Sequence, residues 1–161
     1  MIRYLKIILV VLVGLQGLFY FISNVFNFEY ALAAVGLILS QADSPVYQNL
    51  VIPPITNPLV VKLALITIMT GELLVGLISF KGAFDMFAKA GAPAADFNAA
   101  KTYAVLGCGM ALIVWFGFFT VFGTALLQMW QGQVGAGSFE GSHMYLVPSA
   151  LVMIFVHMKD E

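Results

Sequence analysis

The sequence predicts an all-α protein, a four-helix transmembrane bundle with a short interfacial helix in its first outer connection. Composition is the first observation: the 161 residues are 61% hydrophobic and 9% charged, with a mean hydropathy of +0.99. A soluble domain carries about a quarter charged residues, so this chain cannot cover a water-facing surface. The second observation is that four apolar stretches reach the roughly 20 residues that cross the hydrocarbon core. A lipid-exposed backbone must satisfy its own hydrogen bonds, which four elements achieve only as helices.

The four expected spans form a single transmembrane domain and cover residues 4–25, 59–80, 102–129 and 141–158. The first apolar stretch is longer than the roughly 7–15 residues of a signal-peptide core, so we expect an uncleaved helix. Pro58 suits the first turn of the second helix. The fourth span is the shortest, and we expect Pro148 in its early turns, where few helical hydrogen bonds are lost.

The connections carry their own signals. Residues 31–40 are apolar but too few to cross, so we expect a short helix in the outer interface or packed on the bundle. Asp43-Ser44-Pro45 reads as a turn. In the middle connection, Asp96 or Asn98 is expected to cap the third helix. Four aromatic residues fit an outer interfacial belt: Tyr30, Tyr47, Trp130 and Tyr145.

The placement of the charges predicts the orientation of the chain. Six of the seven lysines and arginines flank the termini and the middle connection, and Lys62 is the exception. The positive-inside rule therefore predicts that both termini and the middle connection are cytoplasmic. The net charge of −1 gives no reason to expect nucleic acid. We expect membrane lipid, and other membrane protein subunits, as partners.

Glu72 is the first candidate functional residue, because it lies near the middle of the second span. A carboxylate at this depth costs about 2.5–3.5 kcal/mol on insertion scales. The apolar surroundings disfavour its charged form, so we expect it to be largely protonated at neutral pH. It could relay a proton or cation, anchor a ligand or a partner helix, or simply bond to a neighbouring helix. Gln16, at a similar depth in the first span, is the candidate partner.

The other candidates for chemistry are sparse. His143 and His157 lie on one helix about 21 Å apart, so they cannot share a haem iron, and His143 is at most an outer-side ligand. Cys108 lies in an apolar run and is expected in the core. We find no metal-ligand motif, phosphate loop or nucleophile beside a base, so no metal and no catalytic residue are expected.

Small residues predict how the helices pack. Thr67 with Gly71, and Gly107 with Ala111, have the small-xxx-small spacing that lets membrane helices approach closely. The phenylalanines of the third span are interpreted as packing or lipid-facing residues rather than a cofactor site: Phe116, Phe118, Phe119 and Phe122.

Three stretches resemble a known family, and they lie at 55–58, 92–101 and 129–131: Ile-Thr-Asn-Pro, Ala-Pro-Ala-Ala-Asp-Phe-Asn-Ala-Ala-Lys and Met-Trp-Gln. They are similar to motifs of a family of small bacterial integral membrane proteins of unknown function. The resemblance implies a four-helix protein of the inner membrane with no established activity. The sequence departs from the family pattern at residues 124–126, where Thr-Ala-Leu replaces Gly-Glu-Trp, and at His143, which replaces an arginine.

Three functional hypotheses remain open at this point. The first is a non-catalytic accessory subunit that packs against a larger membrane protein complex, because the chain is small and lacks a catalytic constellation. The second is a proton- or solute-conducting protein that uses Glu72. The third is a subunit that binds quinone or lipid in a cleft between helices, although no cofactor is predicted from a motif.

Overall fold

The computed structural model describes residues 1–44, 46–47 and 49–161, so Pro45 of the predicted turn lies outside the described residues. The predicted four-helix transmembrane bundle is confirmed, because four helices are long and apolar enough to cross a membrane. They are α1 (Ile2–Phe26), α3 (Pro58–Ala88), the third span Ala94–Leu126, and α6 (Gln133–His157). The described part of the chain contains no strand.

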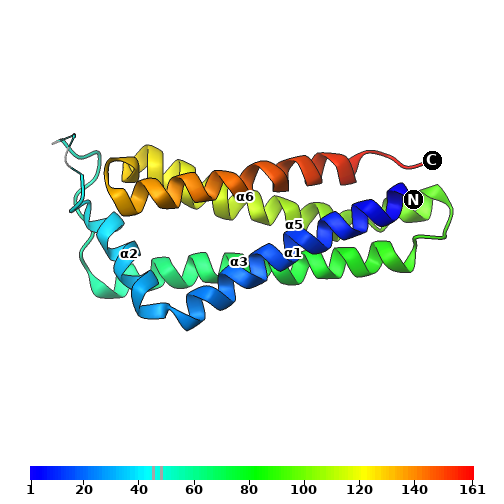
Figure 1. The fold of residues 1–161 in the computed structure, drawn as a ribbon, viewed down its shortest axis with the longest axis horizontal. Helices are drawn as coiled ribbons and strands as arrows, with labels where there is room; N and C mark the ends of the chain where they lie inside the picture. The colour runs from blue at the N-terminus through cyan, green and yellow to red at the C-terminus, as the bar shows by residue number, and fades with distance from the viewer. Residues whose placement is uncertain (45, 48) are drawn as a thin grey trace.

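The short helix expected in the first connection is also present, as α2 (Phe28–Ser40). It crosses one end of the bundle, which we call the α2 end (Figure 1). Both chain termini and α4 (Ala94–Ala99) lie at the opposite end, which we call the termini end (Figure 1). An even number of spans requires this placement of the termini. Which end faces the cytoplasm stays a prediction from the charges.

Two helices extend further than hydropathy indicates. Helix α3 continues from residue 80 to Ala88, and Lys81 and Asp85 form an ion pair of 2.5 Å one turn apart on the added segment. Helix α6 begins at Gln133 rather than at 141, directly after Gly132 in extended conformation. Pro148 therefore lies in the middle of α6 and not in its early turns, so the prediction for this residue was wrong. The first turns of α6 are rich in Gly and Ser, which hides them from a hydropathy scan.

The third span changes its helical geometry along its length. Helix α5 (Thr102–Leu112) is followed by a π-helix, η1 (Ile113–Leu126), and by a single 3₁₀ turn, η2 (Met129–Gln131). The backbone N–H of Leu127 donates to the carbonyl oxygen of Phe122 at 2.9 Å, the five-residue spacing of a π-helix. Such geometry is rare beyond a single turn and is frequent at functional sites. The span ends before residue 129 because Gln128 adopts a left-handed conformation.

The start of α3 agrees with the sequence prediction, and the start of α4 does not. The side chain of Asn57 accepts a hydrogen bond from the N–H of Leu59 at 2.9 Å, and Pro58 occupies the first turn of α3. Helix α4 instead follows Pro93 without a side-chain cap, so the predicted capping by Asp96 or Asn98 was wrong. The amide of Asn98 binds the C-terminal segment instead.

Glycines bring α3 close to the helices on either side of it. A Cβ added at Gly17 of α1 would lie 2.7 Å from the carbonyl oxygen of Glu72, and one at Gly107 of α5 would lie 2.8 Å from the backbone of Ser79. Gly71, Gly107 and Ala111 are buried, as close helix packing requires. Thr67 is exposed, and its hydroxyl donates to the carbonyl oxygen of Leu63, so it takes no part in this contact.

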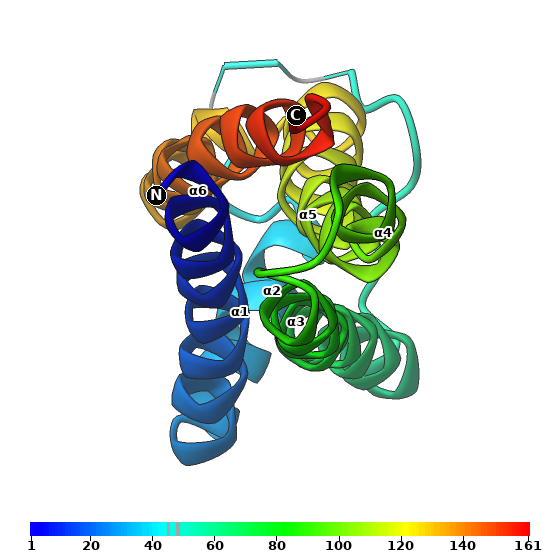
Figure 2. The same cartoon turned by 90° about the vertical axis from the view of Figure 1, so that its right-hand side faces the viewer.

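The bundle is tight at the termini end and splayed at the α2 end. Helices α1 and α3 diverge from α6 and η1 as they approach α2, and α2 crosses the gap between the two layers (Figures 1 and 2). The close contacts at Gly107 and at Gly82, which lies against Ala104, belong to the tight half. The splayed half is where polar and aromatic residues of four helices meet.

Replacing Gly107 by alanine is expected to lower the free energy of unfolding by about 1–3 kcal/mol, because the new Cβ would overlap the α3 backbone. Gly109 on the same helix is the matched control, since a Cβ there meets nothing within 4 Å. Thermal unfolding in detergent, followed by circular dichroism, measures both variants. Equal unfolding midpoints for the two variants would contradict the tight contact between α3 and α5.

Candidate functional site

A cavity of about 560 Å³ occupies the splayed half of the bundle beneath α2. Its wall comes from α1, α2, α3, η1 and α6, and it is mostly apolar. Small and aliphatic residues of α2, such as Ala34 and Ile38, form one side, and no residue of α2 is fully buried. The cavity therefore exists because α2 spans the gap between two diverging layers without filling it.

Glu72 lies on the wall of this cavity and is only 2% exposed. Its Oε2 accepts a hydrogen bond from Nδ2 of Asn24 at 2.8 Å. Gly17 allows this contact, because it lets α1 approach the α3 backbone at Glu72 itself. The mid-membrane carboxyl identified from the sequence is thus a cavity residue held by an amide of the first helix.

Gln16, the partner expected for Glu72, does not bind it. Its side-chain nitrogen is buried and has no hydrogen-bond partner within the described residues. Asn24 was missed, although a signal for it exists: residues 17, 20 and 24 share one face of α1, and Gly17 marks that face as the one against α3. Depth alone favoured Gln16, because Asn24 lies about 12 Å further along α1.

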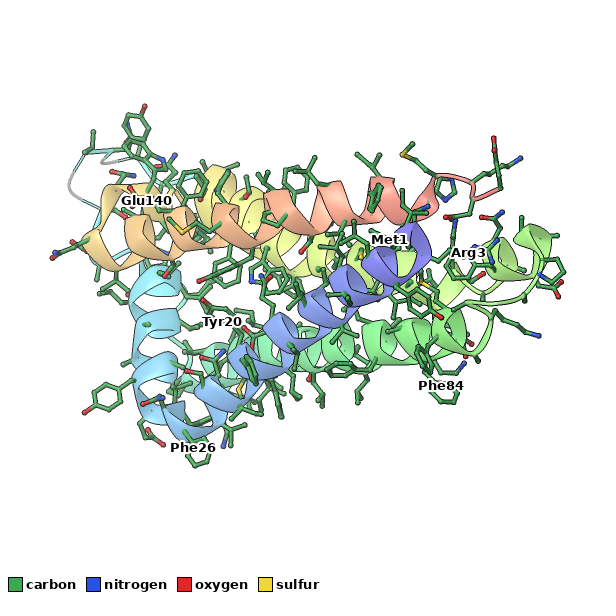
Figure 3. All side chains as sticks on the ribbon, turned by 45° about the vertical axis from the view of Figure 1, so that its right-hand side comes forward. Met1, Arg3, Tyr20, Phe26, Phe84 and Glu140 are labelled. Carbon is green, nitrogen blue, oxygen red and sulfur yellow. The ribbon has the colours of Figure 1, made fainter. Side chains whose placement is uncertain are left out.

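Three aromatic residues from different helices meet on the same wall. The ring centroids of Tyr20 and Tyr145 are 4.6 Å apart, and the ring of Trp115 lies 6.3 Å from Tyr20 and 5.6 Å from Tyr145. The hydroxyls of Tyr20 and Tyr145 share a hydrogen bond between α1 and α6, and Figure 3 labels Tyr20 in the space between these helices. Tyr145 is therefore a cavity residue, and its predicted place in an interfacial aromatic belt was wrong.

The phenylalanines of η1 complete the aromatic part of the wall. Phe118, Phe119 and Phe122 line the cavity, whereas Phe116 is exposed. The sequence favoured packing or lipid contact for all four, because nothing in it indicated a hollow beside the third span.

Most hydroxyl groups on the wall are already satisfied by their own helices. Thr67, Ser138 and Ser142 each donate to a backbone carbonyl three or four residues earlier, at 2.7–2.9 Å. The polar side chains that remain to contact a ligand are those of Glu72, Asn24 and the tyrosine pair. The cavity thus offers a large apolar volume with one polar corner.

Positive charge is missing from the described residues that line the cavity, since none of them is lysine, arginine or histidine. His143, the possible outer-side ligand, lies off the cavity, with Nδ1 3.0 Å from the carbonyl oxygen of Phe139. No group of three or more metal-ligating side chains occurs within the described residues. The site can therefore bind through apolar contact, aromatic faces and one carboxyl group.

A second polar cluster, the C-terminal clasp, lies at the termini end and consists of Lys6, Lys101, Asn98 and Asp160. Lys6 and Lys101 both donate to Oδ2 of Asp160, at 2.7 Å for Lys6, and the side chain of Asp160 is about 3% exposed. Asn98 bonds the backbone of Asp160 in both directions at 3.0 Å. Arg3 lies at the same end (Figure 3) and donates to two carbonyl oxygens of the α3–α4 connection, those of Ala90 and Ala92.

The clasp keeps its carboxylate ionised. Burial by itself raises the pKa of Asp160, but hydrogen bonds and charge from Lys101 and Lys6 outweigh it and hold the pKa below its ordinary value. The distribution of charges along the sequence predicted that these lysines lie on the same side of the membrane. It could not identify Asp160 as their partner, because the acid and the lysines come from three segments far apart in the chain.

The comparison with protein families agrees with the four spans. Residues 2–159 match the family described as a predicted small integral membrane protein, DUF2165. No curated protein and no solved structure matches the chain. The description names no activity, so the chemistry of the cavity must be argued from its own residues.

Asp160→Asn is expected to lower the free energy of unfolding by about 2 kcal/mol at neutral pH, because two buried lysines lose their counter-ion. Since the folded pKa is lowered, this contribution is present above the ordinary aspartate pKa of about 3.9 and is lost as the pH falls through the folded value. Thermal unfolding at several pH values measures it. Glu161→Gln is the control, and equal neutral-pH midpoints for both variants would contradict the clasp.

Proposed function

We propose that the chain, which belongs to the DUF2165 family of predicted small integral membrane proteins, binds a membrane-dissolved small molecule between its helices. The observation that carries the proposal is the cavity beneath α2, with its apolar wall and its polar corner at Glu72. Ligand sites typically enclose about 300–1,000 Å³, are mainly apolar and orient the ligand with a few polar groups. At about 560 Å³ the cavity falls in this class.

The wall fits a molecule with an apolar body and a small polar head. Aliphatic residues of α2 and the phenylalanines of η1 would contact the body, while Glu72, Asn24 and the tyrosine pair would orient the head. This supports the third sequence-level hypothesis, a protein that binds molecules of the quinone or lipid class. It also retains Glu72 as the polar centre that the carrier hypothesis required.

Access from the bilayer is consistent with the positions of several wall residues. Phe122, Thr67 and Gly137 line the cavity and are exposed rather than buried, Phe122 at 53%, so the cavity is open at these residues. A molecule dissolved in the hydrocarbon could therefore pass between the diverging layers without crossing a water-facing surface. The inner membrane of a bacterium, which the family resemblance implies, is the proposed location.

The accessory-subunit hypothesis stays a prediction beside this one. The spans expose large apolar side chains along their outer faces, which lipid or a partner subunit would cover equally well. Binding a molecule in the cavity is compatible with either arrangement. The two roles separate experimentally, because one depends on the cavity and the other on the outer faces.

Occupancy of the cavity can be followed by fluorescence, because the chain has two tryptophans and Trp115 alone lines the cavity. A Trp130→Phe variant reports on Trp115, and titration with a short-chain benzoquinone or a brominated fatty acid is expected to quench it in a saturable manner. Contact between ligand and the Trp115 ring is the physical reason for the quenching.

The matched control is Trp115→Phe, which leaves Trp130, a residue that packs edge-to-face with Tyr47 and does not line the cavity. Quenchers that only dissolve in the detergent or lipid would affect this variant without saturation. Indistinguishable titrations of the two single-tryptophan variants would show that neither quencher occupies the cavity.

Mild-detergent purification from the native membrane tests the accessory-subunit hypothesis. A stable subunit is expected to elute with other membrane proteins at a fixed ratio, measured by light scattering and mass spectrometry. Elution as a lone monomer, with nothing co-purifying, would remove that hypothesis and leave the cavity proposal untouched.

A further inference from the structure

Glu72 and Asp160 both have buried carboxyl groups, but of the two only Asp160 has a counter-ion among the described residues. Two lysines bind Asp160 in the clasp. Around Glu72, the described wall of the cavity holds no lysine, arginine or histidine, and Asn24 supplies a neutral amide. A buried ionised carboxylate is costly unless a positive charge or a proton compensates it. The fold therefore leaves a place for a positive charge beside Glu72.

The aromatic residues beside this place suit a cation with an apolar body. Tyr20, Trp115 and Tyr145 cluster on the same wall, with ring centroids 4.6–6.3 Å apart. Aromatic faces attract cations through their quadrupole, most strongly where water is excluded, and they recognise quaternary ammonium groups in this way. The cavity combines this surface with one carboxyl group and a large apolar volume.

Resting on the proposed function, we propose that the cavity binds a lipophilic organic cation, such as a substituted ammonium or phosphonium ion, in competition with a proton on Glu72. The exchange balances in charge: the cation enters, the carboxyl group loses its proton, and that proton leaves to water. An anionic phospholipid is disfavoured, because its phosphate would face Glu72 without a lysine or arginine. A neutral quinone would leave the proton on Glu72 in place and would release none on binding.

The competition predicts a direction for the effect of pH. The other titratable groups on the described wall are Tyr20 from α1 and Tyr145 from α6, whose hydroxyls bind each other. The residues of α2 and η1 on the wall offer none, and Glu72 is the titratable residue that α3 contributes. Acidification therefore acts on the site through Glu72, and affinity for the cation falls as the pH falls.

Calorimetry with tetraphenylphosphonium tests the proposal in detergent at pH values from about 5 to about 8. Saturable binding is expected, and the number of protons released per cation is expected to rise toward one as the pH falls, as linkage between proton and ligand requires. Tetraphenylborate has the same shape and the opposite charge, and it is expected not to bind. Equal binding of the two ions, or binding of the cation without proton release, would overturn the proposal.

Glu72→Gln is expected to weaken binding of tetraphenylphosphonium by about tenfold or more and to abolish its pH dependence. Glu140→Gln, at an exposed acid of α6 that does not line the cavity, is the matched control. Unchanged affinity in the Glu72→Gln variant would overturn the proposal. If that variant does not fold, proton release from the unaltered protein decides the question alone.

The titrations with neutral quenchers separate this inference from the proposed function. If the benzoquinone quenches Trp115 in a saturable manner and tetraphenylphosphonium does not bind, the cavity is a ligand site for a neutral molecule and the cation proposal fails. If neither the cation nor the neutral quenchers occupy the cavity, the proposed function fails as well.

Discussion

Close contact between helix backbones at glycines is the constraint on which this bundle depends. In lipid there is no hydrophobic force between helices, so association relies on packing and on interhelical hydrogen bonds. Gly17, Gly82 and Gly107 place α1 and α5 directly against α3. Since the closest of these contacts lie toward the termini end, the layers are free to diverge at the other end, where α2 crosses the opening. The cavity is thus a consequence of the positions of the glycines along the helices.

The two buried acids show how differently one fold can treat the same chemical group. Asp160 is fixed by two lysines and an amide, so its charge is structural and joins the C-terminal segment to α1 and α4. Glu72 receives a hydrogen bond from a single amide and lines a cavity with aromatic walls. A carboxyl group that the fold pairs completely is a structural element. A carboxyl group that has a single hydrogen-bond donor and lines a cavity is suited to bind a ligand.

The sequence predicted the parts of this structure that depend on composition and missed those that depend on the meeting of distant segments. Length and hydropathy predicted four spans and the short helix α2, and the isolated acid in an apolar helix pointed to Glu72. Asn24 rather than Gln16, Tyr145 inside rather than at an interface, and Asp160 between two lysines all depend on how helices rotate against one another. The π-helical geometry of η1 likewise has no signature in the apolar pattern.

We propose that the space beneath α2 is a ligand site rather than a region of loose packing between two layers. An experimental structure of the protein in lipid nanodiscs tests it most directly. We expect continuous density for a ligand between α2 and η1, with its polar end against Glu72 and Asn24. A structure in which α2 and the aromatic residues of η1 close on each other and fill that space would contradict it.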